Sequence, residues 1–240
     1  MTNLTEEQMK QLTMYSVYTE EPAHRLFTLE TILQADQMEA ILQTIQVISG
    51  SPNRTVTASY FTRRFGMFTA MQFTSLVQSN ITWKGESNNL VFGVNEEYGR
   101  KTVSTYTRAE DWKVISNGRR EEEIWHILHN ECAAVFHQMR SVTAISPLIM
   151  WENIFGFLLW QYHVLLANPS TAQNARKDLE LLKADRLWEG IAPKSLFASY
   201  LKGCEPSELL NTTVRKTCCL SKDVPGLMQC GFCPLKNAKG

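Results

Sequence analysis

The chain has 240 residues, enough for one large domain or for one domain with a small appendage. About 44% of the residues are hydrophobic, so a sizeable core is available, and 24 basic residues balance 24 acidic ones. This balance, without a long run of Lys or Arg, argues against a protein built to bind nucleic acid. The N-terminal sequence MTNLTEEQMKQLT lacks the basic and apolar regions of a secretory signal.

The first part of the chain has mainly helical patterns. The first 50 residues look helical, with Asp36 as the N-cap of a helix that ends at Gly50. Large apolar residues at mixed spacing predict a second, largely buried helix over 55–78. Arg63 and Arg64 interrupt it, and we expect them to cover one solvated face.

Short segments rich in Val, Thr, Phe and Tyr follow, with glycines between them. They cover residues 81–84, 90–94 and 102–107. This composition, with glycines between the segments, predicts one small antiparallel meander.

The chain becomes helical again at Arg120, where acidic residues occupy the first turn. Ser146 and Pro147 form a good N-cap and N1 pair for a helix that ends near Asn168. Two more helices are expected, over 172–189 and 193–201. Together these elements predict an α+β fold with a helix-rich body and one small antiparallel sheet.

The segment 147–167 is apolar and long enough to suggest a membrane span. It nevertheless contains Glu152, Asn153, Gln161 and His163, and each of these would be costly in lipid. We therefore expect a buried helix and no integral membrane span.

The last part of the chain differs in character from the body. Beyond Pro206 come cysteines, Lys and Gly with little periodicity. We therefore divide the chain into a body, 1–205, and an irregular C-terminal segment, 206–240. A segment this short cannot bury a core of its own, and a metal centre would order it.

Four of the six cysteines lie in this segment: Cys218, Cys219, Cys230 and Cys233. Their spacing is C-C-x10-C-x2-C, and four thiolates so close together suit either tetrahedral zinc or an iron–sulfur cluster. Adjacent residues tend to point apart, which suits a single ion less well than a centre with two metals. The spacing alone does not decide between a zinc site and an iron–sulfur cluster.

The motif also carries a resemblance to a known family. The RKTCC sequence before the first pair and the QCGFCPLK sequence around the second resemble the C-terminal [2Fe–2S] motif of the FhuF family of ferric siderophore reductases. The helix-rich body with a short sheet is similar to that family as well. The resemblance implies that Cys218, Cys219, Cys230 and Cys233 hold a [2Fe–2S] cluster.

The resemblance further implies a cytoplasmic oxidoreductase that passes one electron from the cluster to Fe(III) in a siderophore, of hydroxamate or citrate type. Such a reaction releases Fe(II), which hard oxygen donors bind less tightly. The chain has neither a G-x-G-x-x-G nor a P-loop sequence, so electrons are expected from an external donor protein or a small reductant. A structural zinc module and an iron–sulfur sensor are the alternatives.

Basic residues next to the cysteines, namely Arg215, Lys216 and Lys222, are candidates for contact with an anionic ferric complex. They would also offset the charge of a cluster, which is about −2 when four thiolates bind an Fe₂S₂ core. The alternative is that each is an ordinary solvated side chain.

We expect structural roles for the histidines, the other two cysteines and the tryptophans, although such residues can bind metals or substrates. His126 and His129 lie three apart on a helix, which is common by chance, and His163 is expected to be a hydrogen-bonded core histidine. Cys132 is expected to be a buried thiol, and Cys204 is expected to be an ordinary buried or exposed thiol, with a spare thiol near the metal as the alternative. The tryptophans that could line a siderophore cleft are expected in the core instead: Trp125, Trp151, Trp160 and Trp188.

Overall fold

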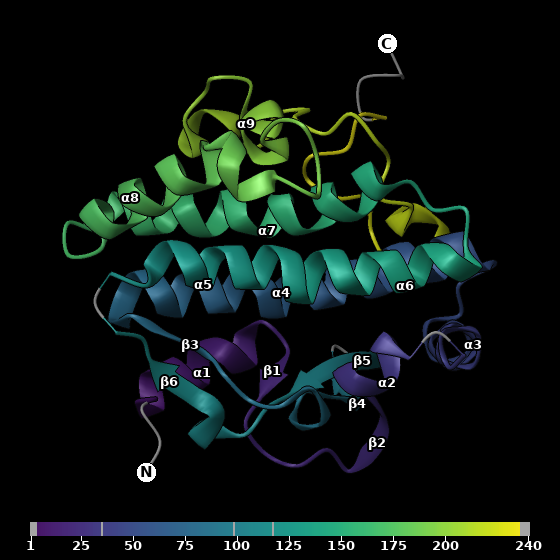
Figure 1. The fold of residues 1–240 in the computed structure, drawn as a ribbon. Helices are drawn as coiled ribbons and strands as arrows, with labels where there is room; N and C mark the ends of the chain where they lie inside the picture. Colours follow the sequence, from purple (N-terminus) through teal and green to yellow (C-terminus); the bar gives the residue numbers. More distant parts are fainter. Residues whose placement is uncertain (1–3, 35, 98, 117, 236–240) are drawn as a thin grey trace.

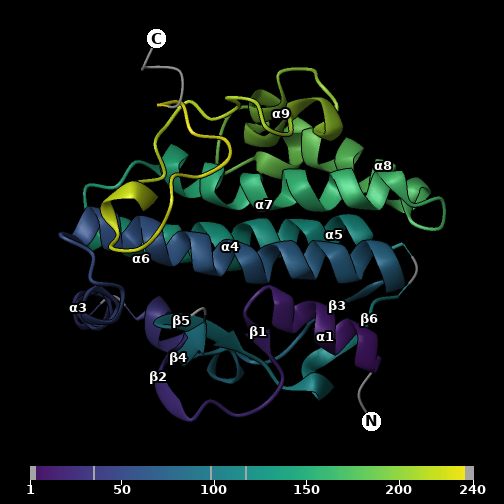
Figure 2. The same ribbon diagram turned by 180° about the vertical axis from the view of Figure 1, so that it is seen from behind.

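The computed structural model of the chain describes residues 4–34, 36–97, 99–116 and 118–235. Its elements form three tiers (Figures 1 and 2). The lower tier holds the strands and three helices, α1 (Glu6–Met14), α2 (Leu29–Leu33) and α3 (Met38–Ser49). The middle tier holds α4 (Arg54–Ser79), α5 (Arg120–His126) and α6 (Ala134–Val142). The upper tier holds α7 (Pro147–Ala167), α8 (Ala172–Lys183) and α9 (Leu196–Leu201), together with the C-terminal segment.

The predicted helix-rich α+β fold is confirmed, but the strands do not form one meander. A four-stranded sheet has the order β1-β5-β4-β2, made of β1 (Val17–Tyr18), β2 (His24–Thr28), β4 (Val91–Glu97) and β5 (Arg100–Tyr106). Here β4 pairs antiparallel with β2 and β5, while β1 joins β5 in parallel. The first predicted strand, β3 (Ile81–Trp83), pairs instead with β6 (Trp112–Val114) in a separate ladder.

Two predictions for the first 50 residues are wrong. This part is not wholly helical, because β1 and β2 lie between α1 and α2. Asp36 is not the N-cap of α3, since Gln37 takes that position without a side-chain hydrogen bond. The predicted end is correct, because Gly50 adopts the left-handed conformation, with φ of 67°, that a helix C-cap favours.

The predicted helix over 55–78 is confirmed as α4. Asn53 caps its start by accepting a hydrogen bond from the Val56 N–H at 3.0 Å, and Asn80 ends it in the left-handed conformation. Its apolar residues include Phe61, Phe65 and Phe68, which are fully buried. Helix α4 therefore forms the centre of the core.

The prediction for 147–167 is confirmed as α7, a buried helix. Pro147 occupies its first turn, and the Ser146 hydroxyl accepts from the Leu148 N–H. Among the described residues, no helix combines the length and the apolar character that a membrane crossing requires.

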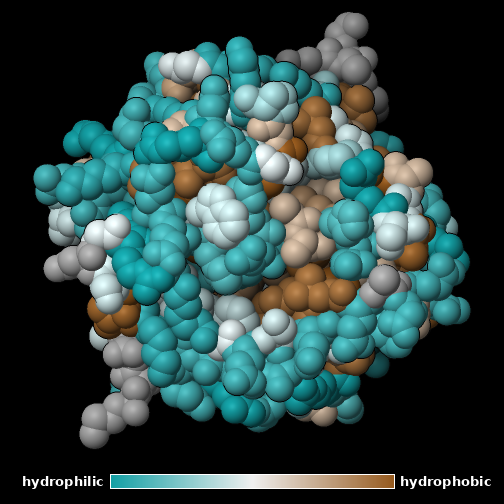
Figure 3. All heavy atoms as spheres, in the orientation of Figure 1, coloured by the Kyte–Doolittle hydropathy of each residue, from teal (hydrophilic) through white to brown (hydrophobic). Residues whose placement is uncertain are grey.

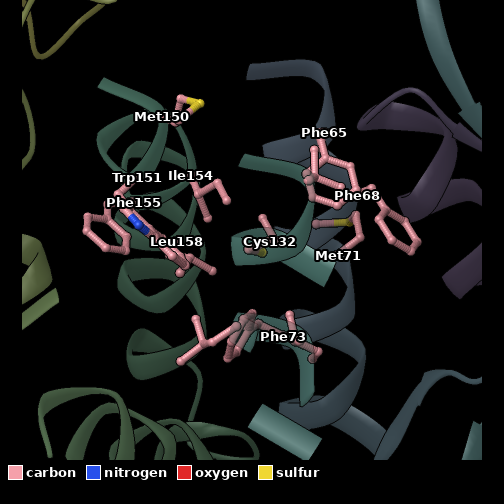
Figure 4. Packing of buried hydrophobic residues seen from close by; sticks show 14 of the residues in the cluster. Phe65, Phe68, Met71, Phe73, Cys132, Met150, Trp151, Ile154, Phe155 and Leu158 are labelled. Carbon is pink, nitrogen blue, oxygen red and sulfur yellow. The ribbon is translucent and has the colours of Figure 1, made fainter. Parts of the chain in front are cut away.

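Helices α4 and α7 pack closely against each other. Figure 4 shows Ile154 and Leu158 on the side of α7 that faces α4, with Cys132 between the two helices. Phe68 lies on the opposite side of α4 and packs against Trp83 and Trp112 of the strands. Gly66 permits the close approach, because a Cβ at this position would lie 3.2 Å from the Cα of Ile154 and 3.3 Å from the Asn153 carbonyl oxygen.

Cys132 lies within this core, as expected of a buried thiol (Figure 4). It belongs to a π-helical stretch, Ile127–Ala133, that joins α5 to α6 without a break. Burial raises the pKa of its thiol, so the thiolate form is disfavoured. Cys132 is therefore a packing residue.

Polar residues cover the outer side of the middle tier. Figure 3 shows the face that carries α5 and α6, where most visible atoms belong to hydrophilic residues and hydrophobic residues show in separate patches between them. The C-terminal segment lies on the other side of α7 and reaches down to α4 (Figure 2, yellow).

The described part of the C-terminal segment, 206–235, contains only two short 3₁₀ turns, Pro206–Leu209 and Ser221–Asp223. It nevertheless has buried residues, and Val214 and Val224 belong to the hydrophobic core. The segment is therefore irregular, as predicted, but it is packed onto the body.

Candidate metal centre

A buried carboxylate fixes the backbone just before the first cysteine pair. Glu152 of α7 is only 1% exposed and accepts hydrogen bonds from the backbone N–H groups of Lys216 (2.8 Å) and Thr217 (3.0 Å). The Thr217 hydroxyl donates to the same carboxylate. Such charge-assisted bonds are among the stronger ones in proteins, so α7 determines where the turn to Cys218 begins.

Arg215 completes this anchor from inside the protein. Its guanidinium donates to the backbone carbonyls of Glu152 (3.0 Å), Thr217 (3.1 Å) and Ile149 (3.4 Å) and lies 3.7 Å from the Glu152 carboxylate. Both side chains are almost fully buried, so each compensates the charge of the other. Arg215 therefore holds the segment in place as well as lying near the cysteines.

Helix α4 contributes a second anchor, at Cys219. The Ser59 hydroxyl donates to the Cys219 carbonyl at 2.7 Å. The side-chain amide of Asn153 donates to the backbone and the hydroxyl of Ser59, both at 3.1 Å, and to the Thr62 hydroxyl at 2.9 Å. Residues of α4 and α7 thus fix the first cysteine pair together.

Hydrogen-bond donors surround the cysteine sulfurs. Cys218 Sγ accepts from the Leu220 N–H at 3.3 Å. Cys233 Sγ accepts from the Gln229 amide at 2.9 Å and from the Leu235 N–H at 3.4 Å. Hydrogen bonds to sulfur stabilise thiolates and are one of the means by which proteins tune the potential of an iron–sulfur centre.

Cys219 has the most polar environment of the four. The Arg63 guanidinium lies within hydrogen-bond reach of its sulfur, at 3.7 Å, and the Ser221 hydroxyl is 3.1 Å from the same atom. The nearby Cys230 thiol, with help from Arg63 and Ser221, lowers the pKa of Cys219. The same interaction raises the pKa of Cys230.

The two cysteine pairs therefore lie close enough to influence each other. Cys230 acts on Cys219, and burial, together with the charges of Cys219 and Cys233, raises the pKa of Cys218. All six cysteines of the chain are described, and all are free thiols. Among the described residues, however, no group of three or more His, Cys, Asp or Glu side chains is arranged to hold a metal ion.

The donor set fits a [2Fe–2S] cluster in its chemistry. Four thiols from two neighbouring turns are the usual ligands of such a cluster, and donors already point at the sulfurs of Cys218, Cys219 and Cys233. The cluster itself, its ligand assignment and the division of the chain at residue 205 stay predictions.

The two lysines predicted near the substrate lie at the surface. Lys216 and Lys222 are both exposed, and the Lys222 ammonium pairs with Asp223 at 2.8 Å. This hydrogen bond raises the pKa of Lys222, and the sulfurs of Cys218 and Cys233 add to the effect. Lys222 is therefore close to the cysteines. The last residue of the QCGFCPLK motif, Lys236, lies outside the described residues.

A cavity of about 280 Å³ lies beside the cysteines. Cys230, Gly231 and Phe232 of the C-terminal segment form one wall, and residues of α4 and α7, including Arg63 and Trp160, form most of the rest. Tyr15, just after α1, and Arg215 complete the lining. A ligand in this cavity would touch one of the four candidate metal ligands directly.

Two predictions about α4 and the tryptophans need correction. Arg63 and Arg64 do not cover a solvated face, because Arg63 reaches Cys219 and Arg64 pairs with Glu97 of β4 at 2.9 Å. Trp151 and Trp188 are buried as expected, whereas Trp125 is 40% exposed and Trp160 is 47% exposed. Trp160 therefore belongs to the cavity wall and not to the core.

The histidines have structural surroundings. His129 stacks on Trp125 and makes a hydrogen bond with the Leu187 carbonyl at 2.9 Å, and His126 bonds the Asn130 amide. His163 is not the expected hydrogen-bonded core residue: it is half-buried, and its Nδ1 has no partner in the described part of the chain. Cys204 is a half-buried thiol in the loop after α9.

Four residues that position the cysteines were not predicted to do so from the sequence: Ser59, Arg63, Glu152 and Asn153. Their signal was present, since each is a polar residue within a largely apolar helix. Comparison with known protein families found no family that matches the chain, and comparison with curated proteins found no match either.

Proposed function

We propose that Cys218, Cys219, Cys230 and Cys233 bind a [2Fe–2S] cluster and that the protein is a ferric siderophore reductase. The observation that carries the proposal is the arrangement of the C-terminal segment. Anchors on α4 and α7 hold one cysteine pair, and the second pair lies close enough that Cys219 and Cys230 shift each other's pKa in opposite directions.

The surroundings of the sulfurs support a redox role. When bound, a [2Fe–2S] cluster supplies a one-electron couple. The Arg63 guanidinium at Cys219 offsets negative charge there, and the Gln229 amide stabilises electron density on Cys233. Both contacts favour the more negative, reduced state, so they raise the potential at which the site accepts an electron.

The substrate in this proposal is Fe(III) held by the oxygen atoms of a chelator. It gains one electron and leaves as Fe(II), which such hard donors hold less tightly. The electron must come from an external donor protein or a small reductant. Free thiols throughout the chain suit a reducing compartment, and we place the reaction in the cytoplasm.

The first test is the metal content of the protein purified without oxygen. We expect about two irons and two sulfides per chain and a red-brown visible spectrum. A colourless protein that contains one zinc ion per chain would contradict the proposal and support a structural zinc module.

The second test separates a reductase from a sensor. The protein is reduced without oxygen, the excess reductant is removed, and a ferric hydroxamate or ferric citrate is added together with a trap for Fe(II). We expect reoxidation of the cluster with one trapped Fe(II) per electron. A stable cluster that no ferric chelate reoxidises would contradict the reductase proposal and favour an iron–sulfur sensor.

The ligand assignment is tested with two matched cysteine variants. Cys230 and Cys204 are both half-buried, but only Cys230 belongs to the motif. Cys230→Ser is expected to lose most of the iron and colour, whereas Cys204→Ser is expected to keep both. Equal loss from the two variants would refute the assignment.

A further inference from the structure

The cavity beside Cys230 has walls of two kinds. Four aromatic side chains supply apolar surface, and three polar side chains, Arg63, Asn153 and Arg215, lie among them. The aromatic residues are Tyr15, Phe157, Trp160 and Phe232. Apolar walls with a few placed polar groups are typical of small-molecule sites.

Two cations line the cavity, Arg63 and Arg215, and among the described residues no Asp or Glu lines it. The Glu152 carboxylate neutralises Arg215, but among the described residues no carboxylate pairs with Arg63. In the described part of the chain, the Arg63 guanidinium hydrogen-bonds to one sulfur only, that of Cys219. Most of its N–H groups can therefore bind an anion.

Asn153 provides a second, independent indication of a ligand. Its side chain is 2% exposed, and its Nδ2 is fully used by Ser59 and Thr62. Its Oδ1 is buried, and no donor reaches it within the described residues. An unsatisfied buried acceptor is costly and calls for a partner. Asn153 lines the cavity, so this unsatisfied acceptor lies at the cavity wall.

We infer that this cavity binds the electron acceptor and that Arg63 makes it selective for anionic Fe(III) chelates with carboxylate oxygen donors. The inference rests on the proposed function. Arg63 pairs with a carboxylate of the chelate, and the aromatic walls cover the carbon skeleton of the chelator. With about 280 Å³, the cavity holds a compact complex or one arm of a larger one.

The position of the cavity suits electron transfer by contact. Cys230 is part of its wall, and Arg63 reaches Cys219 from the same space. An acceptor seated there lies against the sulfur of a proposed cluster ligand. Arg63 thus acts on both partners, because it neutralises charge on the acceptor and on a cysteine sulfur.

The test uses binding, which does not depend on the cluster potential. Ga(III) citrate matches ferric citrate in charge but does not accept an electron under these conditions. It is titrated into the cluster-loaded protein, and the Kd is followed by tryptophan fluorescence and equilibrium dialysis. Arg63→Gln is expected to weaken binding at least tenfold, and Arg63→Lys is expected to restore part of the loss. Arg140→Gln, at an exposed position on α6, is the control and is expected to change the Kd less than twofold.

A second pair of variants removes an aromatic wall without touching the cysteines. Trp160 and Trp125 are similarly exposed, at 47% and 40%, but only Trp160 lines the cavity. Trp160→Ala is expected to weaken Ga(III) citrate binding about fivefold or more, and Trp125→Ala to leave it unchanged in dialysis. Unchanged binding in both Arg63→Gln and Trp160→Ala would overturn the inference.

Selectivity is tested by the reoxidation rate of the reduced protein. For Arg63→Gln, kcat/KM is expected to fall at least tenfold with ferric citrate and less than threefold with a neutral ferric tris-hydroxamate. Equal losses with both chelates would overturn the assignment of Arg63 as the selective residue. If no chelate oxidises the wild-type protein, the proposed function fails. If every variant is oxidised like the wild type, only the cavity inference fails.

Discussion

Individual buried polar residues perform specific tasks in this protein. Glu152 and Asn153 interrupt the apolar sequence of α7, and both hold the C-terminal segment or its anchor on α4. From the sequence they indicated only that α7 does not lie in lipid. Their partners are 60 or more residues away in the chain, so no local pattern could identify them. The four cysteines, by contrast, were identifiable because their spacing is itself local.

Replacing Glu152 should loosen the cysteine segment. Glu152→Gln keeps the shape of the side chain but removes the charge that faces Arg215 and turns one acceptor into a donor. We expect a loss of about 2–4 kcal/mol in the free energy of unfolding, because a buried cation and a backbone N–H lose their partner. Urea denaturation measures this loss. Glu122→Gln, at an exposed position, is the control, and an equal effect of both variants would contradict the role of Glu152.

Glu131 is a buried carboxyl that makes stability depend on pH. Burial raises its pKa to about 8, although the Gln72 amide donates to it at 2.5 Å. The folded protein therefore keeps this proton where the unfolded chain has lost it. The contribution of Glu131 to the free energy of unfolding is fully present below the pKa of the unfolded chain, near 4.5. This contribution falls as the pH rises towards 8.

The corresponding prediction compares wild type with Glu131→Gln in urea denaturation at about pH 5 and pH 8. Between these values the wild type is expected to lose up to ~4 kcal/mol more than the variant, from a shift of about 1.4 kcal/mol per pKa unit. The same slope in both proteins would show that Glu131 ionises normally.

Among the elements, the helices were predicted better than the sheets. Helices such as α4 and α7 follow from local periodicity and caps, and their boundaries were close to those expected. The partner of β3 could not be predicted, because it is β6, a three-residue strand beyond the β4–β5 hairpin. Strand β1 has only two residues, which is too short for an alternating sequence pattern. Its pairing with β5 is therefore determined by tertiary contacts.

The contact between α4 and α7 depends on a small residue. A Cβ at Gly66 would already lie 3.2–3.3 Å from α7, and a branched side chain would force the helices apart. Gly66→Val is expected to cost about 2 kcal/mol or more in urea denaturation, as overpacking in a core does. The same helices anchor the cysteines, so the variant should also bind less iron. Gly203→Val, at an open position with φ of 81°, destabilises through backbone strain and not through helix packing, so it should keep its iron.

At the scale of the whole molecule, a body with its own core carries a segment that has hardly any regular structure. The body contains most of the buried hydrophobic residues, and the segment adds a few, such as Val214 and Val224. Its order depends on the anchors described above and, in our proposal, on the metal centre.

Removal of the metal should therefore affect the segment and spare the body. After treatment with a chelator under reducing conditions, we expect backbone amides of 224–235 to exchange hydrogen at least tenfold faster, while those of α4 and α7 stay protected. Hydrogen exchange with mass spectrometry measures both regions in one sample. Equal acceleration throughout would mean that the metal stabilises the entire fold, and no change would argue against a metal in the segment.

The two cysteine pairs are tethered unequally. Ser59 and Glu152, on two long helices, fix the backbone around Cys218 and Cys219, whereas the donors to Cys233 are Gln229 and Leu235 of the segment itself. If the four cysteines hold the proposed cluster, the earlier pair is the half of the site that the body supports, and the later turn is the half whose sulfur donors come from the segment itself. Such a division would make cluster loss visible first in the loop after Val224 and last around Cys218 and Cys219.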